Sequence, residues 1–297
     1  MAKKLAIGSW AYTFGPYAAH PVPLHDVIRQ VGALGFDGIE LNGFAPHAHP
    51  ELYPTKASRR RLVAFLASHG LVACGYAPDF GAVPPALTSA QEYERLFARY
   101  LEFCVDCGIP KLRVDTVSEP GSVDLAGEEE VMDRVAPIWR RCARLAQDAG
   151  VLLVWEFEPG FVFNKPSQVL GLESRIDHPN FKILFDSCHA HLCSTQASRQ
   201  AGRVERLAGG EVEFAALLQG KIGHVHLIDS DNTLHDGTTS THVPFGLGIL
   251  DFPAIVRAVL AAGYHDAWWG IDLCFWPDAW DATASARSFV STLLGSV

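Results

Sequence analysis

Acidic side chains and histidines follow four apolar runs in the second half of the sequence. Buried without a partner, each group would cost several kcal/mol, and a divalent cation would supply the missing charge. Mixed oxygen and nitrogen ligands suit Mn²⁺, Mg²⁺, Co²⁺ or Zn²⁺, and the residue types do not select one. A single acid at a strand end is more often a helix cap or an ion-pair partner, so the prediction of one metal site depends on all four runs. The groups are Glu156 and Glu158, Asp186 and His189, His224 and His226, and Asp272.

Two of these pairs leave the individual ligand undecided. Side chains two residues apart on a strand point to the same face. Glu156 and Glu158 therefore share one face, and so do His224 and His226. Strand alternation alone does not say which member of each pair would contact a metal ion.

A repeated unit must position these groups. Amphipathic stretches end at a glycine or a short polar break, and an apolar run follows at a spacing of roughly 30 to 40 residues, as in βα units. Eight repeats predict an α/β fold, a single (β/α)8 TIM barrel domain over residues 1–297. An open doubly wound sheet is the alternative, but no Gly-x-Gly-x-x-Gly follows the first strand. We expect strands at Leu5–Tyr12, Gly38–Leu41, Leu71–Tyr76, Lys111–Val114, Val151–Phe157, Phe181–Phe185, Ile222–Ile228 and Ala267–Leu273, and helices at Leu24–Leu34, Ser58–Ser68, Ala90–Cys107, Glu128–Gln147 and Phe252–Ala262.

In a parallel barrel the active site lies at the carboxyl ends of the strands, where the loops converge above a packed interior. Three residues at the ends of earlier expected strands, Trp10, Glu40 and Asp115, are candidates to line such a pocket. Each could equally be a packing or capping residue.

Four local patterns resemble the xylose isomerase-like barrels, a family that includes sugar phosphate isomerases and epimerases and, more distantly, the apurinic endonucleases. The resemblance extends over essentially the whole chain and is strongest from Gly150 to Asp272. The patterns are Gly150-Val-Leu-Leu-Val-Trp-Glu156, the Asp-x-x-His of Asp186 and His189, His224-Val-His226-Leu-Ile-Asp229, and the His-x-x-x-Gly-x-Gly that begins at His242.

This resemblance implies one divalent metal ion held by Glu156, Asp186, His226 and Asp272. It also implies that Glu156 and Asp272 transfer protons on opposite faces of the substrate, through an enediolate. The residues expected to contact the substrate are His189, His242 and Glu158, and hydrogen bonds to metal-binding carboxylates are the alternative role for the two histidines.

The sequence departs from the family pattern in two places. Asp272 stands where sugar epimerases usually carry Glu, which shortens the side chain by one methylene. The third and fourth expected strands lack the histidines of the endonucleases, so the resemblance does not imply a three-metal cluster.

Composition and charge limit the partners and the location. A formal net charge of −9 disfavours nucleic acid as a partner. No apolar run approaches the roughly 18 residues of a membrane span. The start of the sequence lacks a signal-peptide pattern, and seven cysteines suit reduced thiols. We therefore expect a cytoplasmic protein, which could form a homo-oligomer. A small sugar-like molecule as its partner is what the resemblance implies.

The resemblance implies isomerisation or epimerisation of a ketose, a sugar phosphate or a related polyol. One alternative is a metal-dependent dehydratase or lyase that acts on a cyclic polyol or a keto-acid, because an enediolate can also lose a β-hydroxyl. A second alternative is a non-catalytic sugar-binding barrel, which the shorter Asp272 favours.

Overall fold

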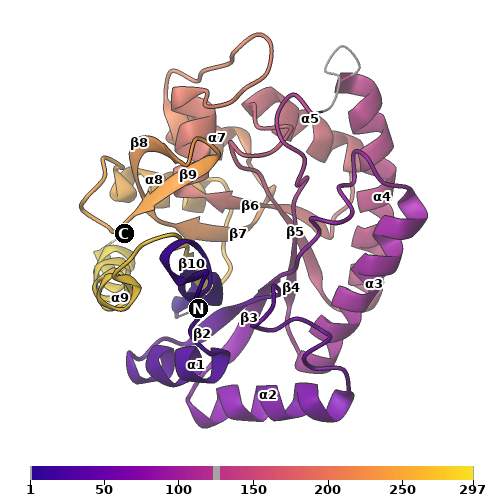
Figure 1. The fold of residues 1–297 in the computed structure, drawn as a ribbon. Coiled ribbons are helices and arrows are strands. Elements are labelled where there is room, and N and C mark those ends of the chain that lie inside the picture. Colours follow the sequence, from indigo (N-terminus) through magenta and orange to yellow (C-terminus); the bar gives the residue numbers. More distant parts are fainter. Residues whose placement is uncertain (1, 123–127, 297) are drawn as a thin grey trace.

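Eight parallel strands close into a barrel in the computed structural model, which describes residues 2–122 and 128–296 (Figure 1). Strand β1 pairs with both β2 and β10, and this double pairing closes the cylinder. The prediction of a single (β/α)8 TIM barrel is confirmed. The barrel strands are β1 (Lys4–Gly8), β2 (Gly38–Asn42), β3 (Val72–Ala77), β4 (Lys111–Val114), β5 (Leu152–Glu156), β6 (Phe181–Asp186), β7 (Ile222–Leu227) and β10 (Trp268–Ile271).

Helices surround the barrel (Figure 1), and their apolar side chains pack against it. In α1, for example, Val27, Ile28 and Val31 lie on one face and are buried. Helix α3 begins after Ser89, whose side chain accepts a backbone N–H, and ends at Gly108, whose φ of 66° favours glycine. Within the described ranges, none of the helices is both long and apolar enough to cross a bilayer. The helices are α1 (Leu24–Ala33), α2 (Lys56–Ser68), α3 (Ala90–Cys107), α4 (Glu128–Asp148), α5 (Pro166–Ile176), α6 (Ser187–His191), α7 (Gly210–Leu217), α8 (Phe252–Ala261) and α9 (Ala279–Ser296).

The first strand is shorter than predicted. It stops at Gly8, and Ser9–Tyr12 form a 3-10 turn instead of continuing the strand. A Cβ on Gly8 would lie 2.0 Å from the indole of Trp10, so the glycine lets the turn fold Trp10 closely over the end of the strand. The turn directs Trp10 into the opening of the barrel, where it lines a pocket.

An antiparallel hairpin that the sequence analysis did not predict follows β7. Its strands are β8 (Asp229–His235) and β9 (Thr239–Val243), so His242 lies on a strand and not in a loop. The glycines after it wrap around Asp229, because Gly246 and Gly248 donate backbone N–H groups to its Oδ2 at 3.0 and 3.1 Å. A Cβ on Gly248 would lie 2.3 Å from the same carboxylate. The glycine motif therefore fixes the hairpin through its backbone.

Candidate active site

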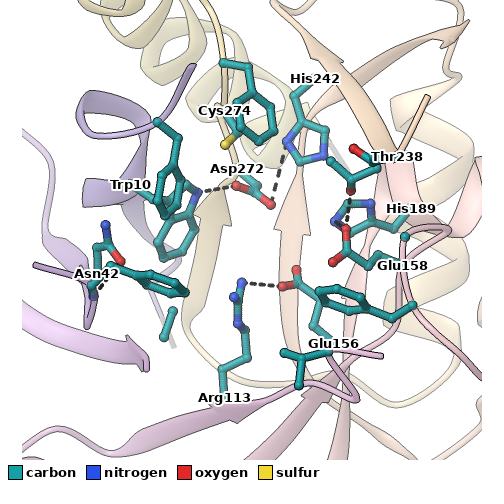
Figure 2. Close-up of a pocket in the computed structure, with 18 of the residues that line it drawn as sticks. Trp10, Asn42, Arg113, Glu156, Glu158, His189, Thr238, His242, Asp272 and Cys274 are labelled. Atoms are coloured by element: carbon teal, nitrogen blue, oxygen red, sulfur yellow. Dashed lines mark hydrogen bonds and ion pairs between the residues drawn. The ribbon is translucent and has the colours of Figure 1, made fainter. Parts of the chain in front are cut away.

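A pocket of about 350 Å³ opens at the carboxyl ends of the barrel strands (Figure 2). This volume falls within the range of roughly 300–1,000 Å³ that is typical of small-molecule sites. The rings of Phe14, Phe44, Phe161 and Phe275 supply much of its apolar lining. Six of the residues that the sequence analysis singled out also line it: Trp10, Glu156, Glu158, His189, His242 and Asp272.

Four ionisable residues from four neighbouring strands meet beside this pocket, and two of them, Glu156 and Asp272, line it. Glu156, Asp186 and His226 lie on β5, β6 and β7, and Asp272 directly follows β10. One ligand atom from each residue lies within 4.8 Å of the others, and all four side chains are buried. These residues, called the ligand cluster below, are the four ligands that the sequence analysis proposed, and the structure brings them together.

The ligand cluster holds a carboxylate that the protein does not neutralise. Oδ2 of Asp186 is buried and has no hydrogen-bond partner among the residues that the structure describes. Burial raises the pKa of Asp186 well above its usual range, and the nearby charges of Asp272 and Glu156 raise it further. Three carboxylates and one imidazole are suitable ligands for Mn²⁺, Mg²⁺, Co²⁺ or Zn²⁺. The residues therefore fit one divalent cation.

A half-buried arginine that the sequence analysis missed lines the pocket and contacts the ligand cluster. Arg113 in β4 donates to Glu156 Oε2 at 2.5 Å and to Asp115 Oδ2 at 3.1 Å. Burial alone would raise the pKa of Glu156, but Arg113 and His226 outweigh burial and hold that pKa below its usual value. Glu156 is therefore ionised at neutral pH. The signal in the sequence is a charged residue within an otherwise buried strand.

One side of the pocket carries Glu158, His189 and His242 (Figure 2). Nδ1 of His189 lies 2.8 Å from the hydroxyl of Ser240, and the hydroxyl of Thr239 donates to Glu158. Burial raises the pKa of Glu158 to about 8 and lowers the pKa of His189 to about 3, so both are mainly uncharged at neutral pH. Within residues 2–122 and 128–296, neither ring nitrogen of His242 has a hydrogen-bond partner, which leaves this ring available to a bound molecule.

The carboxylate of Asp272 comes close to the other members of the ligand cluster, although its side chain is one methylene shorter than that of glutamate. The indole Nε1 of Trp10 donates to Oδ1 of Asp272 at 2.5 Å (Figure 2). The other oxygen, Oδ2, lies 3.6 Å from Nδ1 of His226 and 3.7 Å from Nδ1 of His242. An aspartate at this position therefore still lies within reach of a shared cation.

Two residues that were expected to line the pocket are not part of its wall. The carboxylate of Glu40 lies inside the barrel, where Nε2 of His224 and Nε2 of His226 are 2.9 and 3.0 Å from Oε1. Asp115 is buried and accepts a hydrogen bond from Arg113. Glu40 is held by two buried imidazoles, whereas Asp115 is held at one oxygen by Arg113, which itself lines the pocket. The other oxygen of Asp115, Oδ1, has no hydrogen-bond partner among the described residues. Of the two β7 histidines, His226 belongs to the ligand cluster and His224 lies outside it.

The chain matches the family described as xylose isomerase-like TIM barrel over residues 28–287. It is 23% identical to fructoselysine 3-epimerase from Shigella flexneri over 259 residues, which are 82% of this chain and 83% of that relative. The structure of D-psicose 3-epimerase from Clostridium cellulolyticum H10 with D-tagatose has a TM-score of 0.74 to this chain at 15% identity, covering 98% of this chain and 99% of that one. The IolI protein with a bound zinc atom also has a TM-score of 0.74, at 17% identity, covering 99% and 98%. The match over most of its length shows that this chain belongs to the family of xylose isomerase-like TIM barrels.

Proposed function

We propose that this protein is a divalent-metal-dependent epimerase or isomerase of a ketose-type sugar. The main support is the ligand cluster, whose four ligand atoms lie within 4.8 Å of one another and two of whose members, Glu156 and Asp272, line the pocket. The names of the relatives point to the same substrate class, because one is a fructoselysine 3-epimerase and another is a D-psicose 3-epimerase with D-tagatose. The candidate substrates are therefore a free ketose, a ketose joined to another group, or a sugar phosphate.

Glu156 is the proposed base. It removes the proton from the carbon next to the substrate carbonyl, and the electron pair of that C–H bond moves to form an enediolate. The ion pair with Arg113 holds Glu156 ionised and oriented for this step. The ligand cluster would hold the divalent cation, which supplies a Lewis acid for the negative charge on the substrate oxygens.

Asp272 is the proposed second proton-transfer group. A proton that arrives from Asp272 on the other face inverts the carbon, whereas a proton returned by Glu156 to the neighbouring carbon isomerises the sugar. In an epimerisation one carboxyl starts ionised and the other starts protonated, and the two exchange these states in each turnover. His189 and His242 line the same pocket, which supports assigning them to hold substrate hydroxyls.

Solvent exchange tests this proposal directly. The purified protein is stripped with a chelator and then incubated in D₂O with free ketoses, ketosamines and ketose phosphates, after Mn²⁺, Mg²⁺, Co²⁺ or Zn²⁺ has been restored. We expect NMR to show deuterium at the carbon next to the carbonyl only when a divalent ion is present. The product should be an epimer or isomer with the same elemental composition as the substrate, apart from the exchanged hydrogen. Exchange at full rate in the stripped protein would contradict the metal requirement.

The variant Glu156→Gln tests the base. We expect turnover to fall by roughly 10²–10⁴-fold, the usual contribution of a general base, in a protein that still folds. Glu211→Gln is the matched control: Glu211 is also a poorly exposed glutamate beside a histidine, with His191 Nδ1 at 2.8 Å, but it is not among the residues that line the pocket. Full activity of Glu156→Gln would overturn the assignment.

The product separates this function from its two rivals. A product that is lighter by one water would identify a dehydratase, because isomers have equal mass. A ketose that binds tightly but never acquires deuterium would identify a non-catalytic sugar-binding barrel.

A further inference from the structure

A line of buried polar side chains continues from the ligand cluster toward the amino ends of the strands. Nε2 of His226 lies 3.0 Å from Oε1 of Glu40, and Nε2 of His224 lies 2.9 Å from the same oxygen. Beyond them, Nζ of Lys111 lies 3.0 Å from Nδ1 of His224 and 3.0 Å from Oδ2 of Asp266. We call Glu40, His224, Lys111 and Asp266 the inner chain. The interior of a TM barrel of this kind is normally filled by branched apolar side chains, so this polar chain needs a reason.

The sequence makes room for the carboxylate of Glu40 with two glycines. A Cβ on Gly75 in β3 would lie 2.6 Å from Oε2 of Glu40, and a Cβ on Gly270 in β10 would lie 2.5 Å from Oε1. The same Cβ on Gly270 would come within 2.7 Å of the ring of His226. Any larger residue at either position would displace the contact between Glu40 and His226.

The partners determine which nitrogen of each histidine carries a proton. A lysine ammonium only donates, so Nδ1 of His224 accepts from Lys111 and its Nε2 donates to Glu40. The ionised carboxylate of Glu40 only accepts, so Nε2 of His226 must donate as well. The remaining nitrogen of His226, Nδ1, lies 3.0 Å from the ionised carboxylate of Glu156 and 3.6 Å from Asp272, so it also donates in the metal-free protein. A cation bound by the ligand cluster would take the place of that proton.

We propose that Glu40 is a positioning residue that holds the ring of His226 with Nδ1 directed toward the cation site, an inference that rests on the proposed function. A histidine ligand commonly donates its other N–H to a carboxylate, which fixes the ring and makes the ligand nitrogen more basic. Glu40 is buried and is not among the residues that line the pocket, so its action on the site passes through His226. His224 contacts the same oxygen of Glu40, and Lys111 in turn holds His224.

Metal affinity in Glu40→Gln tests this role without using activity. The metal-free protein is titrated with Zn²⁺ or Co²⁺ against a chromophoric chelator, and its unfolding by denaturant is measured in parallel. We expect metal affinity to fall by about 10–100-fold, the usual effect of losing such a partner, and the Co²⁺ absorption spectrum to change. Glu211→Gln is the control, because it makes the same substitution beside a histidine outside the pocket. It should leave the metal affinity unchanged.

A second variant covers the case in which Glu40→Gln does not fold. Glu40→Asp keeps the charge but shortens the side chain, so we expect a metal affinity below that of the wild type. If Glu40→Gln folds, the affinity of Glu40→Asp should lie between those of the wild type and the Gln variant. Wild-type affinity in the folded variants, with only a loss of stability, would overturn the inference and leave Glu40 a structural residue. A wild-type protein that binds no divalent ion would instead refute the proposed function on which the inference rests.

Discussion

The barrel interior contains two sets of ionisable side chains, and their contacts differ. In the inner chain, Glu40 contacts two imidazole nitrogens, and Lys111 contacts a carboxylate and an imidazole. Each of these contacts joins a donor to an acceptor. In the ligand cluster three carboxylates share one imidazole, and Oδ2 of Asp186 is buried without a hydrogen bond from the described residues. The comparison teaches that residue type alone does not identify a cation site. A buried polar set that satisfies itself supports the fold, whereas a set with an unsatisfied acceptor is built for something that the chain does not supply.

The largest expected effect follows from removing the unsatisfied acceptor. In Asp186→Asn, Oδ1 can still accept the N–H of His189, which lies at 2.7 Å. The second oxygen is replaced by an NH₂ group, which only donates hydrogen bonds and cannot bind a cation. We expect metal affinity to fall by more than the roughly 100-fold loss of a supporting partner, and turnover to disappear. The stability of the metal-free protein should stay the same or rise, because an unpaired buried carboxylate is removed. Chelator competition and denaturant unfolding measure the two quantities.

Asp229→Asn is the matched control for that prediction. Asp229 is an equally buried aspartate, but both oxygens accept backbone N–H groups, from Ser230, Gly246, Gly248 and Leu250. Its substitution should leave metal affinity intact and reduce the free energy of unfolding by roughly 1.5–3 kcal/mol, the value of a hydrogen bond to a charged group. Normal metal binding by Asp186→Asn would remove the distinction between satisfied and unsatisfied carboxylates.

The next effect comes from breaking the inner chain. Lys111→Met removes the donor to His224 and the partner of Asp266, so we expect the free energy of unfolding to fall by roughly 3 kcal/mol. This is the lower end of the range for a buried pair, because about a third of the Asp266 side chain reaches water. Denaturant unfolding measures the loss, and the metal-free and metal-loaded proteins should lose similar amounts. A loss confined to the metal-loaded form would mean that Lys111 belongs to the cation site itself.

The sequence predicts the two sets unequally. The four members of the ligand cluster follow apolar runs at the period of βα units, which is a local pattern, and the resemblance to a family assigned each of them a role. Glu40 and His224 were also singled out at strand ends, but no local signal predicts the contacts of the inner chain, since Glu40 and His224 are 184 residues apart and Lys111 and His224 are 113 apart. Their contact exists only because the barrel closes.

Two local elements also depend on contacts that no periodicity encodes. The 3-10 turn of Ser9–Tyr12 replaces the end of the first expected strand because Trp10 packs on Gly8. The β8–β9 hairpin carries mainly polar side chains and is held at its base by backbone N–H groups around Asp229. In both cases the decisive contact is a close approach to a glycine, Gly8 or Gly248. A strand pattern read from hydrophobicity does not detect such contacts.

The smallest expected effect concerns the hydrogen bond that the indole of Trp10 donates to Oδ1 of Asp272. Trp10→Phe removes this N–H and keeps an aromatic face toward the pocket, so kcat should fall by about 10-fold, equivalent to roughly 1.4 kcal/mol in the barrier, while KM changes little. Trp10→Ala removes the aromatic face as well and should raise KM in addition. Steady-state kinetics on whichever ketose is turned over separates the two variants. Wild-type kcat in Trp10→Phe would show that Asp272 acts without this donor, and the ligand cluster would then gain nothing from the turn that carries Trp10.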